Sequence, residues 1–318
     1  MAVPNHSIVV TRRFFLEKSL KGTTALAVSG LAILSPRRLT GADHIPSSID
    51  ISSPQFAAWT PDGKLLVTFI ANDGSYGLLH KEREAAHSGS FLSVGSGVGQ
   101  FNWPQGIAVS QSTAYIADSN NGRIQRLDLA TQTFLEPFGG LGRKTGLFLR
   151  PQGIYFYGNE LFIADTRNHR IQVFSSDGVV KRTFGELGDG NDQFRLPTSC
   201  AVSSDSEVFV VDSKHALVKV FDLDGRFLRK FGGISSSRKE PGLLNMPTGI
   251  SLDAKSGSVC VADTGNSRIQ IFDIKGKFLR FLESPGIAFR TPQGIALSDS
   301  GDIAVPDPDS DKVWITEL

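Results

Sequence analysis

After residue 43, apolar residues fall in short runs of four to seven that are separated by Gly, Asp, Asn and Ser. Between residues 151 and 185, for example, the runs GIYFYG, ELFIAD, RIQVFS and VVKRTFG follow one another about every ten residues. Short runs rich in Ile, Val, Phe and Tyr and bounded by turn residues are typical of β-strands. No segment after residue 43 has the spacing of an amphipathic helix. The pattern therefore predicts an all-β protein.

The same order of features recurs six times, and each copy opens at a proline. The copies begin at intervals of 45 to 50 residues and read PQFAAW from Pro54, PQGIAV from Pro104, PQGIYF from Pro151, PTSCAV from Pro197, PTGISL from Pro247 and PQGIAL from Pro292. A period of this length that contains four short strands predicts a β-propeller with one blade per repeat.

The two ends of the repeat array complement each other. The sixth repeat offers three strands before the chain ends at Leu318, and residues 45–51 offer one strand more than the first repeat needs. Pairing these segments would close the ring and remove two exposed sheet edges. We therefore predict a six-bladed propeller over residues 43–318, in which the N-terminal strand of the mature chain completes the last blade.

Several segments resemble the NHL repeat, a propeller-forming family: GSGVGQFNWPQGIAV, IADSNNGRIQRLD, IADTRNHRIQVF and VADTGNSRIQIFD. The resemblance is strong in repeats 2, 3 and 5, moderate in 4 and 6, and weak in 1. It implies an NHL/TolB-like propeller fold, and it says little about activity because one fold serves many functions. Residues shared by the repeats are expected to be structural, so function is sought where the repeats differ.

Residues 1–42 have the features of an export signal. Arg12 and Arg13 precede FFLEK, and an apolar stretch over residues 23–34 is too short to span a bilayer. These features resemble a twin-arginine (Tat) signal peptide, which exports proteins already folded. We predict cleavage after Ala42, a periplasmic or otherwise extracytoplasmic protein, and no membrane span after cleavage. A general secretory signal or an uncleaved anchor is the alternative.

Charge and cysteine content narrow the possible partners. Beyond residue 42 the chain has 27 basic and 31 acidic residues, a net charge of −4, which disfavours nucleic-acid binding. The one dense basic cluster in the sequence, at residues 226–239, is expected to be a solvated rim. Cys200 and Cys260 occupy apolar strand positions and are interpreted as buried thiols, with a disulfide as the alternative.

An acid recurs at the end of the second strand of five repeats, and three repeats have an arginine five residues later. Asp side chains at such positions accept backbone N–H groups in turns, and the arginines are expected to bond carbonyls or pair with nearby acids. We interpret both sets as structural: Asp118, Asp165, Asp212, Asp263 and Asp307, with Arg123, Arg170 and Arg268.

The residue after each repeat proline is always a neutral hydrogen-bonding one. In a propeller this position lies near the central channel, so these side chains are expected to surround its mouth and to hold either a neutral polar ligand or ordered water. They are Gln55, Gln105, Gln152, Thr198, Thr248 and Gln293.

A zinc site is the main catalytic alternative. The resemblance extends to a peptide-amidating lyase whose propeller binds zinc through histidines that project into the channel. None of the histidines beyond residue 42 follows a repeat proline, and a metal needs three or four converging ligands. These histidines are His44, His80, His87, His169 and His215. No cofactor is predicted, and calcium or zinc in the channel stays an alternative.

The leading hypothesis is an exported, monomeric, non-catalytic propeller. It would bind a protein, a peptide or a small polar ligand on the face that carries the proline loops, or in the central channel. The candidate binding residues are Trp103, Gln105, Gln152, His169, Thr198, His215 and Gln293. A metal-dependent lyase or hydrolase is the second hypothesis, and nucleic-acid binding is a disfavoured third.

Overall fold

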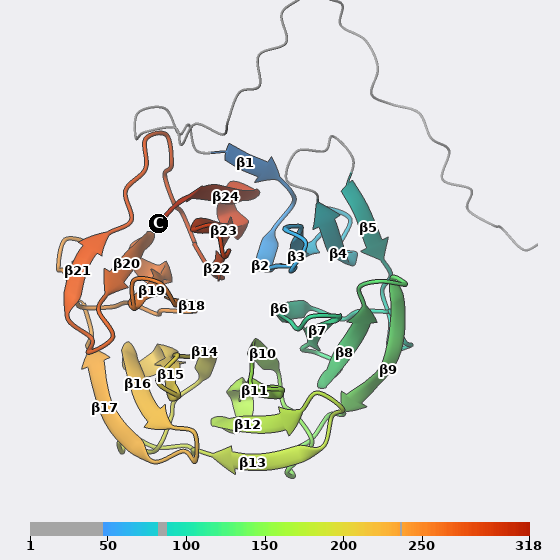
Figure 1. The fold of residues 1–318 in the computed structure, drawn as a ribbon, viewed down its shortest axis with the longest axis horizontal. Coiled ribbons are helices and arrows are strands. Elements are labelled where there is room, and N and C mark those ends of the chain that lie inside the picture. The colour runs from blue at the N-terminus through green and yellow to red at the C-terminus, as the bar shows by residue number, and fades with distance from the viewer. Residues whose placement is uncertain (1–46, 82–87, 236) are drawn as a thin grey trace, which may run out of the picture. The chain divides into compact units, whose positions relative to one another are not determined.

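A computed structural model describes residues 47–81, 88–235 and 237–318. These residues form six four-stranded antiparallel sheets arranged as the blades of a propeller (Figure 1). The predicted all-β, six-bladed architecture is therefore confirmed. In each blade we call the strand nearest the centre A and the outermost strand D.

The strands of the first five blades follow one another in sequence from A to D. Blade 1 contains β2 (Pro54–Trp59), β3 (Leu65–Ile70), β4 (Tyr76–Lys81) and β5 (Ser88–Leu92). Blade 2 contains β6 (Pro104–Val109), β7 (Thr113–Asp118), β8 (Arg123–Asp128) and β9 (Thr133–Gly139). Blade 3 contains β10 (Pro151–Tyr157), β11 (Glu160–Asp165), β12 (Arg170–Ser175) and β13 (Val180–Phe184).

The remaining blades keep the same order. Blade 4 contains β14 (Pro197–Val202), β15 (Glu207–Asp212), β16 (Leu217–Asp222) and β17 (Phe227–Gly232). Blade 5 contains β18 (Ile250–Asp253), β19 (Ser258–Asp263), β20 (Arg268–Phe272) and β21 (Phe278–Phe281). Blade 6 contains β22 (Ala296–Leu297), β23 (Asp302–Asp307), β24 (Lys312–Glu317) and β1 (Ser47–Asp50). Short 3-10 turns lie between strands B and C of blades 3 to 6: η1 (Thr166–Asn168), η2 (Ser213–His215), η3 (Thr264–Asn266) and η4 (Pro308–Ser310).

The ring is closed by pairing between the two ends of the array. Strand β1 runs antiparallel to β24, with Ile49 opposite Val313. Ile49 is buried in a cluster that also contains Val67 of blade 1 and Ala304 of blade 6. The prediction that an N-terminal strand completes the last blade is confirmed.

The two faces of the ring carry different connections. One face, which we call the proline face, carries the loops from strand D to the next strand A and the B–C turns. The repeat prolines and the repeated acids lie there because the start of strand A pairs with the end of strand B, as Pro151 does with Asp165. The opposite face carries the A–B and C–D turns.

The innermost strands approach one another closely near the proline face. A Cβ atom added to Gly106 would lie 2.3 Å from the carbonyl oxygen of Gln152, and one on Gly249 would lie 2.1 Å from that of Gln293. Such contacts exclude any side chain at these two positions without backbone movement. The repeated Pro-x-Gly element is thus explained by close packing of strand A of one blade against the next.

Both cysteines are buried free thiols, so the disulfide alternative is wrong. Cys200 is enclosed in the core between blades 3 and 4, and burial raises the pKa of its thiol to about 12. The predicted signal, including Arg12 and Arg13, lies outside the described residues. In the part of the chain that is described, no helix has the length and apolar character needed to cross a membrane.

Ring closure can be tested at Ile49. We expect Ile49→Ala to lower the free energy of unfolding by about 2 kcal/mol, because it removes a buried side chain that joins the two ends of the array. Ser47→Ala, on an exposed position of the same strand, should change it by less than about 0.5 kcal/mol. Urea unfolding of both variants measures the difference, and equal effects would show that β1 is not part of the cooperative unit.

Candidate functional site

The repeated acid of each of blades 2, 3 and 5 is a buried carboxylate surrounded by hydrogen-bond donors. Asp165 accepts the backbone N–H of Leu149 at 2.7 Å, the amide of Asn168 at 2.8 Å, Nε of Arg170 at 2.9 Å and the amide of Gln172 at 3.0 Å. Burial raises the pKa of the Asp165 carboxyl, while these donors and the guanidinium act in the opposite direction and favour the carboxylate.

The arginine of the same set reaches beyond the acid to the preceding D–A loop. Arg170 donates to the carbonyl oxygens of Lys144 and Leu147, both at 2.9 Å. The equivalent arginines Arg123 and Arg268 pair with Asp118 at 2.8 Å and Asp263 at 2.6 Å. Each set therefore fastens a loop of the proline face to the blade that follows it. This is a structural arrangement with no free polar group for a ligand.

Blade 4 satisfies its acid with different residues. His215, Leu217 and Lys219 stand where blade 3 has Asn168, Arg170 and Gln172. Nζ of Lys219 lies 3.0 Å from Oδ2 of Asp212 and also donates to the carbonyl oxygens of Gly190 and Gln193. The Lys219 side chain is only 1% exposed. In blade 4 the positive charge therefore stands two residues later on the strand than in blade 3. Comparing the arginine position of the repeats does not reveal this shift.

His215 joins this buried pair to the surface. Its Nδ1 lies 2.6 Å from Oδ2 of Asp212, and its Nε2 lies 2.9 Å from Oδ1 of Asp189. Asp189 also pairs with Nε of Arg195 at 2.7 Å. Both ring nitrogens of His215 therefore already have partners, in the manner of a structural residue.

His169 connects blades 3 and 4. Its backbone is left-handed, with φ 55°, and its Nδ1 accepts the backbone N–H of Leu196 at 3.1 Å. Acceptance at Nδ1 requires an unprotonated nitrogen. Burial lowers the pKa of the His169 imidazole, which keeps the ring neutral near pH 7.

Most of the residues after the repeat prolines bond to one another between blades, while Gln152 bonds within its own blade. The buried amide of Gln105 donates to Oε1 of Gln55 at 3.0 Å. The hydroxyl of Thr198 donates to the carbonyl oxygen of Thr248, and that of Thr248 to the carbonyl oxygen of Gln293, both at 2.9 Å. The side chain of Gln152 accepts the hydroxyl of Thr166 at 3.3 Å. The bonds between blades connect neighbouring inner strands near the proline face.

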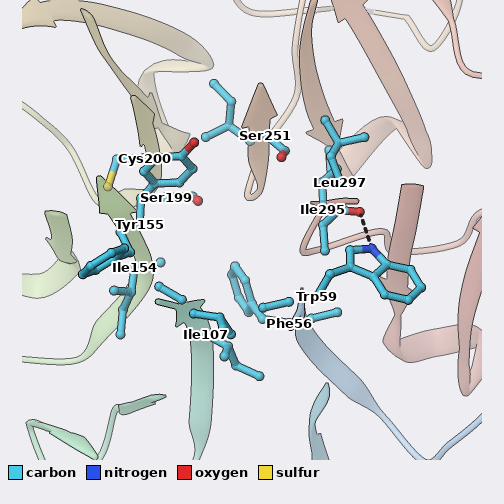
Figure 2. A pocket seen from close by; sticks show the side chains of 18 of the residues that line it. Phe56, Trp59, Ile107, Ile154, Tyr155, Ser199, Cys200, Ser251, Ile295 and Leu297 are labelled. Atoms are coloured by element: carbon cyan, nitrogen blue, oxygen red, sulfur yellow. Dashed lines mark hydrogen bonds between the residues drawn. The ribbon is translucent and has the colours of Figure 1, made fainter. Parts of the chain in front are cut away.

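A central cavity of about 340 Å³ lies deeper between the six inner strands (Figure 2). Most of the side chains that line it are apolar, although polar atoms make up the larger part of its accessible wall, and none of the six residues that follow a repeat proline is among the residues that line it. The main contributors are one residue from each of five blades: Phe56, Ile107, Ile154, Ile250 and Ile295. The side chains after the repeat prolines therefore do not contribute to this cavity, whose open space is bounded mainly by isoleucines.

The cavity continues to the opposite face. Trp59, Val109, Phe156, Leu297 and Asp299 border both this cavity and a hollow of about 430 Å³ among the A–B turns. Trp59 also donates its indole N–H to the carbonyl oxygen of Ala296 at 3.3 Å, which ties blade 1 to blade 6 at the mouth. The cavity therefore has an accessible end on the face without the proline loops.

The proline face carries exposed apolar side chains instead of a polar hollow. Trp103 is 40% exposed, has φ 61° and packs at an angle against Tyr76, with ring centroids 6.3 Å apart. One aliphatic residue in each of four successive D–A loops is between 54% and 76% exposed: Val94, Leu141, Leu187 and Ile234. Each of them forms an isolated bridge to a core residue of the same loop, so the loop backbone is fixed while the side chain faces water.

Blades 3 and 4 add a basic arc to that face, which we define as Arg143, Lys144, Arg150, Arg167 and Lys214. All five side chains are exposed, and none makes an ion pair with a described residue. Segments distant in sequence meet here, since the N–H of Arg167 donates to the carbonyl oxygen of Leu149 and that of Lys214 to Arg195. The sequence did not show this arc because its members come from three separate repeats.

Two residues of the basic cluster that the sequence did show have side-chain partners. Arg229 forms a bidentate ion pair with Glu207, in which its two Nη atoms each lie 2.6 Å from a carboxylate oxygen. It also donates to the carbonyl oxygen of Ile274. Lys230 donates to the side chain of Asn191 at 3.0 Å.

The histidines are dispersed over the ring. His80 lies on β4, while His169 and His215 lie in B–C turns of neighbouring blades. His44 and His87 fall outside the described residues. Among the residues that the structure describes, no three His, Cys, Asp or Glu side chains are grouped to hold a metal ion.

Comparisons with known proteins agree with this architecture. A sequence profile of the NHL repeat matches residues 101–127, 148–174 and 244–272, which lie in blades 2, 3 and 5. No curated protein sequence matches the chain. A solved structure of a protein of unknown function from Bacteroides thetaiotaomicron is similar, with 14% identity and a TM-score of 0.65 over 84% of this chain and 70% of that chain. A gluconolactonase from Xanthomonas campestris has 16% identity and a TM-score of 0.63 over 85% of this chain and 87% of that chain. A chain of a nidogen/laminin complex has 19% identity and a TM-score of 0.57 over 83% of this chain and 89% of that chain. Identities this low establish the fold alone, so the comparisons show a six-bladed propeller that contains NHL repeats.

The buried pair of blade 4 gives a stability prediction. Lys219→Met should lower the free energy of unfolding by about 3 kcal/mol, because it leaves the buried Asp212 carboxylate without its cation. The triple variant His215→Asn, Leu217→Arg, Lys219→Gln rebuilds the donor set of blade 3 and should recover most of that loss. Denaturant unfolding of the two variants checks this, and a triple variant no more stable than Lys219→Met would contradict the assigned equivalence.

His169 gives a pH prediction. Its pKa is lowered from the ordinary 6.5, so the folded state binds fewer protons than the unfolded state, and stability falls as pH drops below about 6.5 toward the lowered value. The charged groups that act on it are Asp212, Arg195, Arg143 and Asp165. His169→Gly should flatten the dependence of unfolding free energy on pH between 7.5 and 5.

The matched control is Ser267→Gly, the equivalent left-handed position in blade 5, where φ is 56°. It relieves the same backbone conformation without removing a titrating group. It should therefore keep the wild-type pH dependence, and an identical flattening in both variants would refute the role given to the imidazole.

Proposed function

We propose that this chain is an exported, non-catalytic propeller whose proline face binds a protein or peptide partner that presents apolar and acidic side chains. Rigid loops on one face of a propeller are suitable for this, because little conformational freedom is lost when a partner docks.

The distribution of exposed apolar residues carries the proposal. Eleven large apolar side chains of the described residues are exposed, and seven of them lie in D–A loops of the proline face. Such a concentration is typical of interaction surfaces, whereas isolated exposed apolar residues are ordinary. The seven are Val94, Val98, Trp103, Leu141, Leu187, Ile234 and Met246.

The basic arc supports an acidic partner. Its five cations have no acidic partner within the described chain. The exposed Leu141 lies in the loop that also contains Arg143 and Lys144, and the exposed Leu187 lies in the next D–A loop. A partner with carboxylates beside apolar side chains would therefore meet complementary charge and buried area together.

A nucleic acid fits this surface less well. The exposed residues beside the arc are aliphatic, while single-stranded nucleic acids are held by aromatic stacking.

Export remains part of the proposal through the twin-arginine pattern at Arg12 and Arg13. A fold whose first and last described strands must pair before the ring is complete agrees with transport of an already folded protein.

The test is quantitative capture of partners by the purified exported protein, with mass spectrometric identification. Leu141→Ser combined with Leu187→Ser should reduce the captured amount of the specific partner at least about tenfold, because full burial of each leucine is worth about 1.5–3 kcal/mol. The matched control is Leu228→Ser with Leu279→Ser, two exposed leucines on outer strands.

Two results would refute the proposal. One is a partner lost equally from the control variant. The other is competition of the partner by single-stranded RNA with steep salt dependence, which would indicate a nucleic-acid surface.

A further inference from the structure

We propose that the central cavity is a second binding site, for a neutral, largely apolar small molecule that carries one hydroxyl or carbonyl group and enters from the opposite face. This site is independent of the protein-binding surface, because it opens on the other side of the ring.

The size and the walls of the cavity set the class of ligand. Its volume of about 340 Å³ lies in the range of small-molecule sites, and most of the side chains that line it are apolar, as in such sites. Apart from the exposed Asp299 at the mouth, no lining residue carries a charge. A charged ligand would lose its hydration there without gaining a partner, and an anion would also pass the Asp299 carboxylate.

The polar groups of the lining occur where the repeats differ. The residue two after the repeat proline is glycine in four blades and Ser199 in blade 4. The residue four after it is alanine in four blades, Tyr155 in blade 3 and Ser251 in blade 5. Three successive blades thus replace small apolar residues with hydroxyl-bearing ones, and all three line the cavity.

These hydroxyls have no use within the described protein. No side-chain hydrogen bond of Ser199, Tyr155 or Ser251 to a described residue is present, although Ser199 is only 6% exposed and comparable polar groups of the ring are bonded. None of the three oxygens is among the buried side-chain atoms without a partner in the described residues, so these hydroxyls face the open space of the cavity. Figure 2 shows Tyr155, Ser199 and Ser251 along one part of the opening, with Phe56 and Trp59 on another part. One side of the cavity can therefore bond a polar group while the other contacts an apolar body.

The first test compares two probes that differ by one hydroxyl, naphthalene and 1-naphthol, titrated into the full chain at pH 7. We expect one site per chain and 1-naphthol to bind roughly two- to tenfold more tightly, as one neutral hydrogen bond would give. Tyr155→Phe combined with Ser199→Ala and Ser251→Ala should remove that difference and leave naphthalene binding unchanged. Equal binding of the two probes to the wild type would overturn the assignment of the polar side.

The second test blocks the cavity. Ser251→Trp should abolish binding of both probes, while Ser204→Trp, on an exposed A–B turn of the same face, should not affect it. If Ser251→Trp fails to fold by circular dichroism, Val109→Trp at the half-buried mouth gives the same comparison. Wild-type affinity in a folded blocking variant would show that the probes bind elsewhere and would refute the site.

Discussion

A buried carboxylate must be surrounded by donors, and this requirement organises blades 2 to 6. The acid at the end of strand B accepts the backbone N–H two residues before the repeat proline in blades 2 to 6, as Asp165 does from Leu149. The loop that enters the blade and the strand that supports it are thereby joined inside the protein, where an unmade bond would be expensive. This also favours a constant repeat length, because the loop that enters each blade must reach the carboxylate of that blade.

Different residues can satisfy the carboxylate, provided that enough hydrogen-bond donors surround it. Blade 3 uses Arg170 with two amides, whereas blade 4 uses Lys219 and His215. Blade 6 uses the Ser310 hydroxyl at 2.9 Å and the Trp314 indole at 3.4 Å. The NHL profile matches the three blades that keep the complete Asn, Arg and Gln set, so its partial coverage reflects this exchange of donors rather than a change of fold.

The sequence predicted the ring well because its signals are local and repeated. Short strands, the proline period and the missing final strand are all visible along the chain, and β1 lies within the predicted residues 45–51. The site was less predictable because it depends on which atoms meet. Gln105 looked available for a ligand, yet its amide is bonded to Gln55. The basic arc is invisible in sequence because Arg150, Arg167 and Lys214 are brought together only by the packing of successive blades.

The two proposed sites differ because the structure treats the two ends of strand A differently. Near the proline face, Gly106 and Gly249 allow the backbones of neighbouring inner strands to touch. The polar side chains there form hydrogen bonds between blades. Binding on that face must therefore use what the loops project outward, which is aliphatic side chains and unpaired cations. Toward the other end, residues such as Ile107 and Ile154 bound an open space, and only the hydroxyls that break the repeat have capacity for a new hydrogen bond. A broad partner on one face and a small neutral molecule from the other could then be bound by the same ring without competing for a single residue.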